Sequence, residues 1–208
     1  MASKKPAGMT VKSNTGVRIS GDGVEDLLAS LLELADAEVL VGFAADENNA
    51  RTDSDEPLNA QLGYIHDNGA PESRIPARPF MIPGIEAAQS AIEAKLSETV
   101  RAVLREGTSG RGPDKARAGL AQTGFIAMNS IKRTINAGVP PPLSERTLRG
   151  RLKAGRKDGG GARKGAAIEL DRRADGQEPS VEFAKPLVDT GQLRNAVTYA
   201  IRSRKKRS

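Results

Sequence analysis

The sequence predicts an α+β fold in which long amphipathic helices pack on a small mixed β-sheet, with extended arms and a basic loop or hairpin insertion. Short segments near both ends show the alternation or apolar runs that are typical of strands. Two long central segments carry apolar side chains at helical spacing. Hydrophobic residues make up 38% of the chain and aromatic residues 3%, with 22 Gly and 12 Pro, so we expect a modest core.

The N-terminal part predicts a strand, a helix and a second strand after a flexible arm at residues 1–15. Residues 17–20 alternate between apolar and polar and predict the first strand. Asp22 then lies three residues before Glu25, a capping-box spacing that predicts a helix start. Residues 38–43 predict a second strand, whose apolar run suggests cover on both faces. The apolar stripe of the helix consists of Val24, Leu27, Leu28, Leu31 and Ala35.

The central part predicts a short helix, an extended segment and two long helices. Residues 58–69 begin as a helix that ends at Gly69, and three prolines then hold residues 70–80 extended. Pro83 suits the start of a helix that continues to Arg105. Asp114 can cap the next helix, and we expect the two long helices to form an antiparallel pair on the sheet. The buried face of the second helix consists of Ala116, Leu120, Gly124, Ala127, Ile131 and Ile135; Gly119 and Gly124 either mark close approach or weaken this helix.

The C-terminal part predicts a basic insertion at 139–185 within a single domain at 16–201. Two short alternating segments, 167–170 and 180–183, could form a long-looped hairpin. Thr190 can cap a short helical turn, after which residues 196–201 alternate as the last strand. The chain then ends in a basic tail at 202–208.

Charge is distributed unevenly along the chain. Residues 1–107 have a net charge of −7 and residues 108–208 a net charge of +13, although the total is only +6. Copies of such a chain can make head-to-tail contacts, in which the acidic face of one subunit meets the basic face of the next. Alternatively, the charged side chains are simply solvated. The absence of cysteine, of a secretory signal and of a long apolar run predicts a protein made in the cytoplasm and not inserted in a membrane.

Little in the sequence favours catalysis. His66 is the only histidine, so a surface or interface position is a better interpretation than an oriented base beside Asp67. The acidic loop 46–57 could hold a divalent cation, but it lacks the spacing of a calcium loop, and a solvated loop is favoured. We therefore expect that the chain is not an enzyme and holds neither a cofactor nor a metal ion. A metal-dependent hydrolase is a much weaker interpretation than a protein without catalytic activity.

Three segments together resemble a known family. Residues 64–72 lead into Ile75-Pro76-Ala77-Arg78-Pro79-Phe80; residues 142–148 read PLSERTL, and residues 185–193 read KPLVDTGQL. In this order they resemble the signature segments of phage tail-completion and virion-morphogenesis proteins, the group that includes the lambda minor tail protein Z type and the Mu-like G type. Asn68 departs from the aromatic residue that is common there, and the basic stretch around 155–180 is longer.

The resemblance implies a structural protein of a tailed-phage virion, located at the neck. It implies a ring of six subunits that joins the tail tube to the head connector, with tail-terminator or tail-tube proteins and head-closure or adaptor proteins as partners. It also implies α+β packing of long helices on a mixed sheet. We expect genomic DNA in the channel as a further possible partner, and no membrane.

The expected contact residues fall into two sets. Those expected at subunit or partner interfaces are Tyr64, His66, Arg78, Phe80, Leu143, Thr147, Leu187, Asp189 and Thr190. For Phe80 an apolar staple onto the following helix is the favoured alternative, and Asp189 and Thr190 suit turn and cap roles. Those expected to face DNA or an acidic partner are Arg146, Arg149, Arg151, Lys153, Arg156, Lys157, Arg163 and Lys164. The second set also supports the alternative function, a cytosolic protein that binds DNA without sequence preference.

Overall fold

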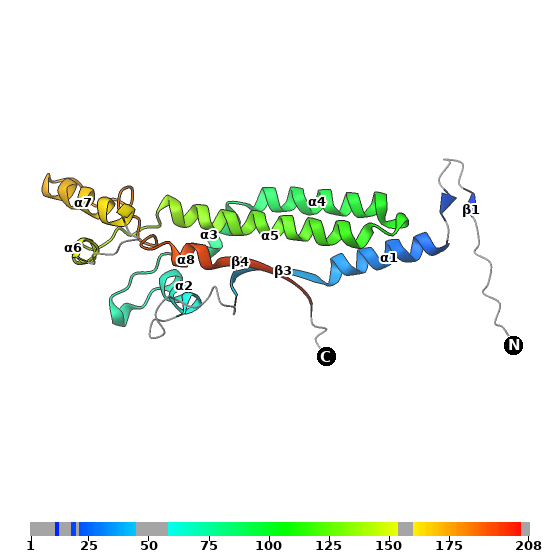
Figure 1. Ribbon diagram of the computed structural model, residues 1–208, viewed down its shortest axis with the longest axis horizontal. Helices are drawn as coiled ribbons and strands as arrows, with labels where there is room; N and C mark the ends of the chain where they lie inside the picture. Colours follow the sequence, from blue (N-terminus) through cyan, green and yellow to red (C-terminus); the bar gives the residue numbers. More distant parts are fainter. Residues whose placement is uncertain (1–10, 13–17, 20, 45–57, 154–159, 205–208) are drawn as a thin grey trace. The chain divides into compact units, whose positions relative to one another are not determined.

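The computed structural model describes residues 11–12, 18–19, 21–44, 58–153 and 160–204 (Figure 1). The acidic loop 46–57 and the basic residues Arg156 and Lys157 therefore lie outside the described residues. In chain order the elements are β1 (Val11–Lys12), β2 (Arg18–Ile19), α1 (Gly21–Asp36), β3 (Ala37–Phe43), α2 (Asn59–Asn68), η2 (Pro71–Ser73), α3 (Met81–Glu86), α4 (Gln89–Glu106), η3 (Gly107–Ser109), α5 (Gly112–Ala137), α6 (Glu145–Lys153), α7 (Gly160–Ala174), α8 (Gln192–Ala196) and β4 (Val197–Ser203).

The α+β class is confirmed, with two-stranded sheets in place of the expected mixed sheet. β1 pairs with β2 in antiparallel register, Val11 opposite Ile19, and β3 pairs with β4. The strand expected at 17–20 therefore exists at Arg18–Ile19, but it does not share a sheet with β3. Leu40 in β3 is exposed, so the expectation of cover on both faces of this strand is wrong.

The chain divides into two compact units, each described by itself. Unit 1 consists of Met1–Leu40, Ser90–Gly124 and Ile201–Ser208. Unit 2 consists of Val41–Gln89 and Phe125–Ala200. The three segments that carry the family resemblance all belong to unit 2.

Unit 1 is built on close contacts between small residues. The parts of α4 and α5 that belong to it run side by side, as the expected antiparallel pair (Figure 1). A Cβ placed on Gly119 of α5 would lie 2.1 Å from Oγ1 of Thr99 in α4, and one on Gly112 would lie 2.1 Å from Oγ of Ser30 in α1. The expected close approach at Gly119 is therefore confirmed. α1 begins at Gly21, so Asp22 is its second residue and not its cap.

The prediction of one long helix from Pro83 to Arg105 is wrong, because this segment is divided into two helices, α3 and α4. Residues 87–88 form a turn between them. Ile85 and Ala88 keep a helical spacing across this turn, which is why the periodicity of the sequence did not reveal it. Pro83 is the third residue of α3, where its missing N–H is not needed for an intrahelical bond.

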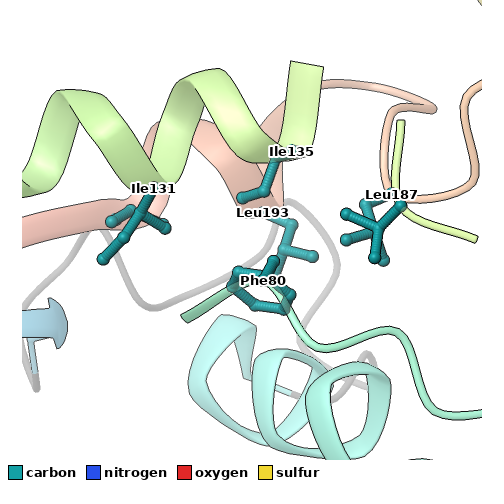
Figure 2. Packing of buried hydrophobic residues seen from close by; sticks show 7 residues of the cluster. Phe80, Ile131, Ile135, Leu187 and Leu193 are labelled. Atoms are coloured by element: carbon teal, nitrogen blue, oxygen red, sulfur yellow. The ribbon is translucent and has the colours of Figure 1, made fainter. Parts of the chain in front are cut away.

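The main core of unit 2 forms where α5 meets α3, α8 and the loop before α8 (Figure 2). Phe80, Ile131 and Ile135 are fully buried there, and the Phe80 ring meets that of Phe43 edge to face at 6.5 Å. A Cβ on Gly84 of α3 would lie 2.8 Å from the Cα of Ile131, so glycine allows α3 to reach α5. The side chains predicted to be buried along α5 are indeed buried: Ala116, Leu120, Ala127, Ile131 and Ile135.

A second, smaller core joins α6 and α7, where the sequence had predicted a basic loop or hairpin. Its buried members are Leu143, Leu148, Ala166 and Ala184. The hairpin is wrong because residues 167–170 are helical and residues 180–183 form no strand. Four alternating residues cannot distinguish a strand from a helix turn, whereas Ala, Arg, Lys, Glu and Leu across residues 160–174 favour a helix. Ser144 caps α6, since its Oγ accepts a hydrogen bond from the Thr147 N–H at 3.2 Å.

The end of the chain follows the prediction closely. α8 is the expected short helix and β4 the expected last strand. Gly191 precedes α8 with a φ of 81°, a conformation that suits glycine, and Thr190 Oγ1 accepts a hydrogen bond from the Gln192 N–H at 3.4 Å. The expected basic tail begins inside β4, since residues 202 and 203 belong to this strand.

Candidate interaction surfaces

The three signature segments meet at one cleft of unit 2. This cleft has a volume of about 1090 Å³ and is lined by parts of residues 62–78, 142–151 and 186–193. It brings together seven of the nine residues expected at interfaces: His66, Arg78, Leu143, Thr147, Leu187, Asp189 and Thr190. Segments more than a hundred residues apart in the sequence thus form one surface.

Arg78 fastens the first signature segment to the second. Its guanidinium donates hydrogen bonds from Nε to the carbonyl of Pro141 at 2.9 Å and from Nη2 to that of Pro142 at 3.4 Å. The residue is 5% exposed. Burial lowers the pKa of Arg78, and the positive charge of Arg151 lowers it further.

Arg151 fastens the second signature segment to the third. It donates hydrogen bonds from Nη1 to the Lys185 carbonyl and from Nη2 to the Pro186 carbonyl, both at 3.1 Å. Asp189 Oδ1 lies 3.7 Å from its Nε. Burial lowers the pKa of Arg151, and Asp189 opposes this effect. Arg151 was expected to face DNA or an acidic partner; its side chain is instead only 8% exposed and ties α6 to the loop at residues 185–189.

His66 and Asp67 hold the extended segment in place. The His66 carbonyl accepts a hydrogen bond from the Arg78 N–H at 2.7 Å. Oδ1 of Asp67 accepts hydrogen bonds from the N–H groups of Phe80 at 2.7 Å and Met81 at 3.1 Å, where α3 begins. Asp67 thus supplies the cap that the sequence around α3 lacks. This role could not be predicted from the sequence, because Asp67 lies far from α3 along the chain.

The remaining predicted interface residues differ in exposure. Phe80 lies in the main core and offers no surface to a partner, so its role in packing replaces the expected partner contact. Leu143 and Leu187 are also core residues, with only their edges on the cleft. Tyr64 is 71% exposed on α2 and lies outside the cleft lining.

The basic residues of α6 and α7 are mostly exposed. Arg149 pairs with Glu145 one turn earlier, and both side chains are more than half exposed. The other described residues of this set that face solvent are Arg146, Lys153, Arg163 and Lys164. These exposed residues are here called the basic surface of α6 and α7; Arg151 is not among them, and Arg156 and Lys157 lie outside the described residues.

Two rows of exposed apolar side chains lie on unit 1. The α1 row consists of Val24, Leu28 and Leu32, which are 49%, 59% and 58% exposed. The α4 row consists of Leu96, Val100 and Leu104. Each row follows a spacing of four residues, so each forms a continuous stripe on its helix. The predicted stripe of α1 mixed this row with Leu27 and Leu31, which are half-buried on the other side.

Glu169 is a buried charged residue that the sequence did not reveal. Its carboxylate is fully buried and accepts hydrogen bonds from Arg172 Nη1 at 2.8 Å, Arg173 Nε at 2.9 Å and the Ser180 N–H at 2.8 Å. Burial raises the pKa of Glu169, but these hydrogen bonds outweigh it and hold the pKa below its ordinary value. The spacing of Glu169 to Arg172 and Arg173 was a signal for a helix here.

Neither a metal cluster nor a membrane-spanning helix is found in the part of the chain that the structure describes. No three acidic, histidine or cysteine side chains gather there at a distance suited to one metal ion. None of the described helices is long and apolar enough to cross a bilayer. Comparisons of the chain with protein-family models, with curated proteins and with solved structures found no match.

Proposed function

We propose that this chain is a structural subunit of a tailed-phage virion that forms a ring at the neck and joins the tail tube to the head connector. The proposal assigns it no catalytic role. The identity of the assembly comes from the resemblance of the three signature segments, and their convergence on one cleft supports treating them as a single functional unit.

The observation that carries the proposal is the pair of apolar rows on unit 1. Leu28 and Leu32 expose more than half of their surface, and Val24 about half. Covering a half-exposed leucine with a partner contributes about 1 kcal/mol. Continuous apolar stripes on the surface of a protein are typical of sites of association, since isolated apolar residues would not line up. A subunit that assembles through helix faces accounts for both rows.

The basic surface on α6 and α7 supports a contact with DNA or with an acidic neighbour. Arg146, Lys153 and Arg163 are exposed, and exposed basic side chains bind phosphates without sequence preference. The same observation favours the alternative of a DNA-binding protein. A ring at the neck accommodates this surface, because the genome passes through it.

The state of the isolated protein tests the proposal. We expect light scattering after gel filtration to give a mass several times the 22.0 kDa of one chain, and negative-stain microscopy to show rings. The alternative is tested by titrating the protein with duplex DNA at increasing salt concentrations and measuring the affinity. A monomer that binds duplex DNA with a steep dependence on salt would support the alternative and contradict the ring.

A further inference from the structure

The outward surface of α1 combines apolar and acidic side chains. The α1 row lies opposite the side that packs inside unit 1, where Leu27 and Ser30 meet the glycines at positions 107 and 112. The helix contains five acidic residues and no basic one, and Glu25, Asp26 and Asp36 are exposed. On a helical wheel, Glu25 and Asp36 lie directly beside Leu32. α1 therefore presents an apolar stripe with a carboxylate edge.

The cleft of unit 2 combines apolar and basic side chains. Its charged lining consists of Arg74, Arg78 and Arg151 against Asp189, so positive charge is in excess. Leu62, Ile75 and Leu193 are among its apolar lining residues. Burial lowers the pKa of Arg78, and the positive charge of Arg151 lowers it further, while Asp189 lies 3.7 Å from Arg151. Carboxylates entering the cleft would add to the negative charge that Asp189 supplies.

We propose that α1 of one copy docks, through its apolar row and its carboxylate edge, in the cleft of a second copy. This inference rests on the proposed function, since it names the contact between neighbouring subunits of the ring. The occupant is a second copy because one chain carries both complementary surfaces, apolar on apolar and acidic on basic. A contact between two different surfaces of the same chain repeats head to tail, and such a contact generates a ring when the rotation closes.

Docking of a helix face in a groove accounts for the spacing of the row. An amphipathic helix that binds a groove anchors through residues three, four and seven or eight apart. Val24, Leu28 and Leu32 supply this spacing on α1. The cleft, at about 1090 Å³, is as large as the largest ordinary ligand pockets, which span roughly 300–1,000 Å³.

Two variants of the full chain test the contact, one on each surface. Leu28→Glu places a charge in the middle of the α1 row, and Ala29→Glu is its control, since it adds the same charge to the next exposed residue of the helix. Gly150→Glu places an acidic side chain at the cleft, where a Cβ meets no atom within 4 Å. Gly161→Glu in α7 is its control, because its Cβ also meets no atom and it does not line the cleft.

The expected result is a loss of assembly that mixing partly repairs. By light scattering, Leu28→Glu and Gly150→Glu should each be monomeric, with a subunit dissociation constant raised at least ~30-fold, while both controls assemble as the wild type does. A 1:1 mixture of the two variants should form a dimer and stop there, since one intact surface of each kind remains.

Other outcomes overturn the inference and separate it from the proposed function. If Gly150→Glu assembles normally while Leu28→Glu does not, α1 contacts some other surface; the docking is then wrong and a ring remains possible. If both variants assemble normally, the ring uses neither surface. If the wild type itself is monomeric at all concentrations, the docking fails and the ring loses its support with it. Circular dichroism of each variant verifies that it is folded.

Discussion

Replacing Phe80 with alanine is expected to lower the free energy of unfolding of the isolated protein by about 3–5 kcal/mol. Phe80 is fully buried in the cluster that contains Ile131 and Ile135 of α5 (Figure 2), and its ring meets the Phe43 ring edge to face. Alanine removes most of these contacts and leaves a cavity that the two isoleucines cannot fill without moving α5. Urea unfolding at a fixed protein concentration measures the change.

Phe125→Ala is the matched control. Phe125 lies on α5 and belongs to the same unit, but it is 55% exposed, so the same substitution should change stability by less than about 1 kcal/mol. The comparison also addresses the IPARPF segment, residues 75–80, which belongs to the stretch that the prolines were expected to hold extended. An unchanged unfolding curve for Phe80→Ala would mean that this segment is not packed in the isolated chain.

The Glu169→Gln substitution is expected to cost about 3 kcal/mol at pH 7. The carboxylate of Glu169 is fully buried and balances the charges of Arg172 and Arg173, which are themselves mostly buried. Glutamine keeps the shape but leaves both guanidinium groups without a counter-charge. Thermal unfolding of the two proteins at the same concentration gives the difference in stability.

The pH dependence of this difference has a defined sign. The pKa of Glu169 is lower in the folded protein than its ordinary value of about 4.3. Its charged form therefore contributes stability fully above that ordinary value, and the contribution is lost as the pH falls through the folded pKa. The gap between wild type and Glu169→Gln should narrow from pH 7 to pH 3.

Glu145→Gln provides the control for the buried pair. Glu145 also pairs with an arginine four residues later, but both side chains are more than half exposed, and such a pair contributes at most about 1 kcal/mol. Equal losses of stability for Glu169→Gln and Glu145→Gln would contradict the account of Glu169 as a buried centre of charge.

Local patterns predicted much of the fold because they report on one element at a time. The spacing of Leu120, Ala127 and Ile131 was sufficient to predict the buried face of α5, and turn residues located the end of α2 and the start of α8. The same reasoning failed at α7, where four alternating residues suggested a strand. There the decisive interactions were the helical pairs of Glu169 with Arg172 and Arg173.

The candidate site was predicted in part. The signature segments gave most of the residues that line the cleft, but periodicity could not indicate that they meet, because the hydrogen bonds of Arg78 and Arg151 span 34 to 64 residues of the chain. Burial agrees with the packing role that was favoured for Phe80, and it restricts Arg151, whose side chain is only 8% exposed, to the cleft that it lines. The exposure of the α1 row was not predicted, because apolar residues at helical spacing are normally assigned to a core.

The proposed role at the neck is tested most directly by electron microscopy of lysates from a phage whose copy of this gene has been deleted. We expect filled heads and tails that remain separate, few or no infectious particles, and joining restored when the protein is supplied in trans. Intact, infectious virions in the absence of this chain would contradict the proposed role at the neck.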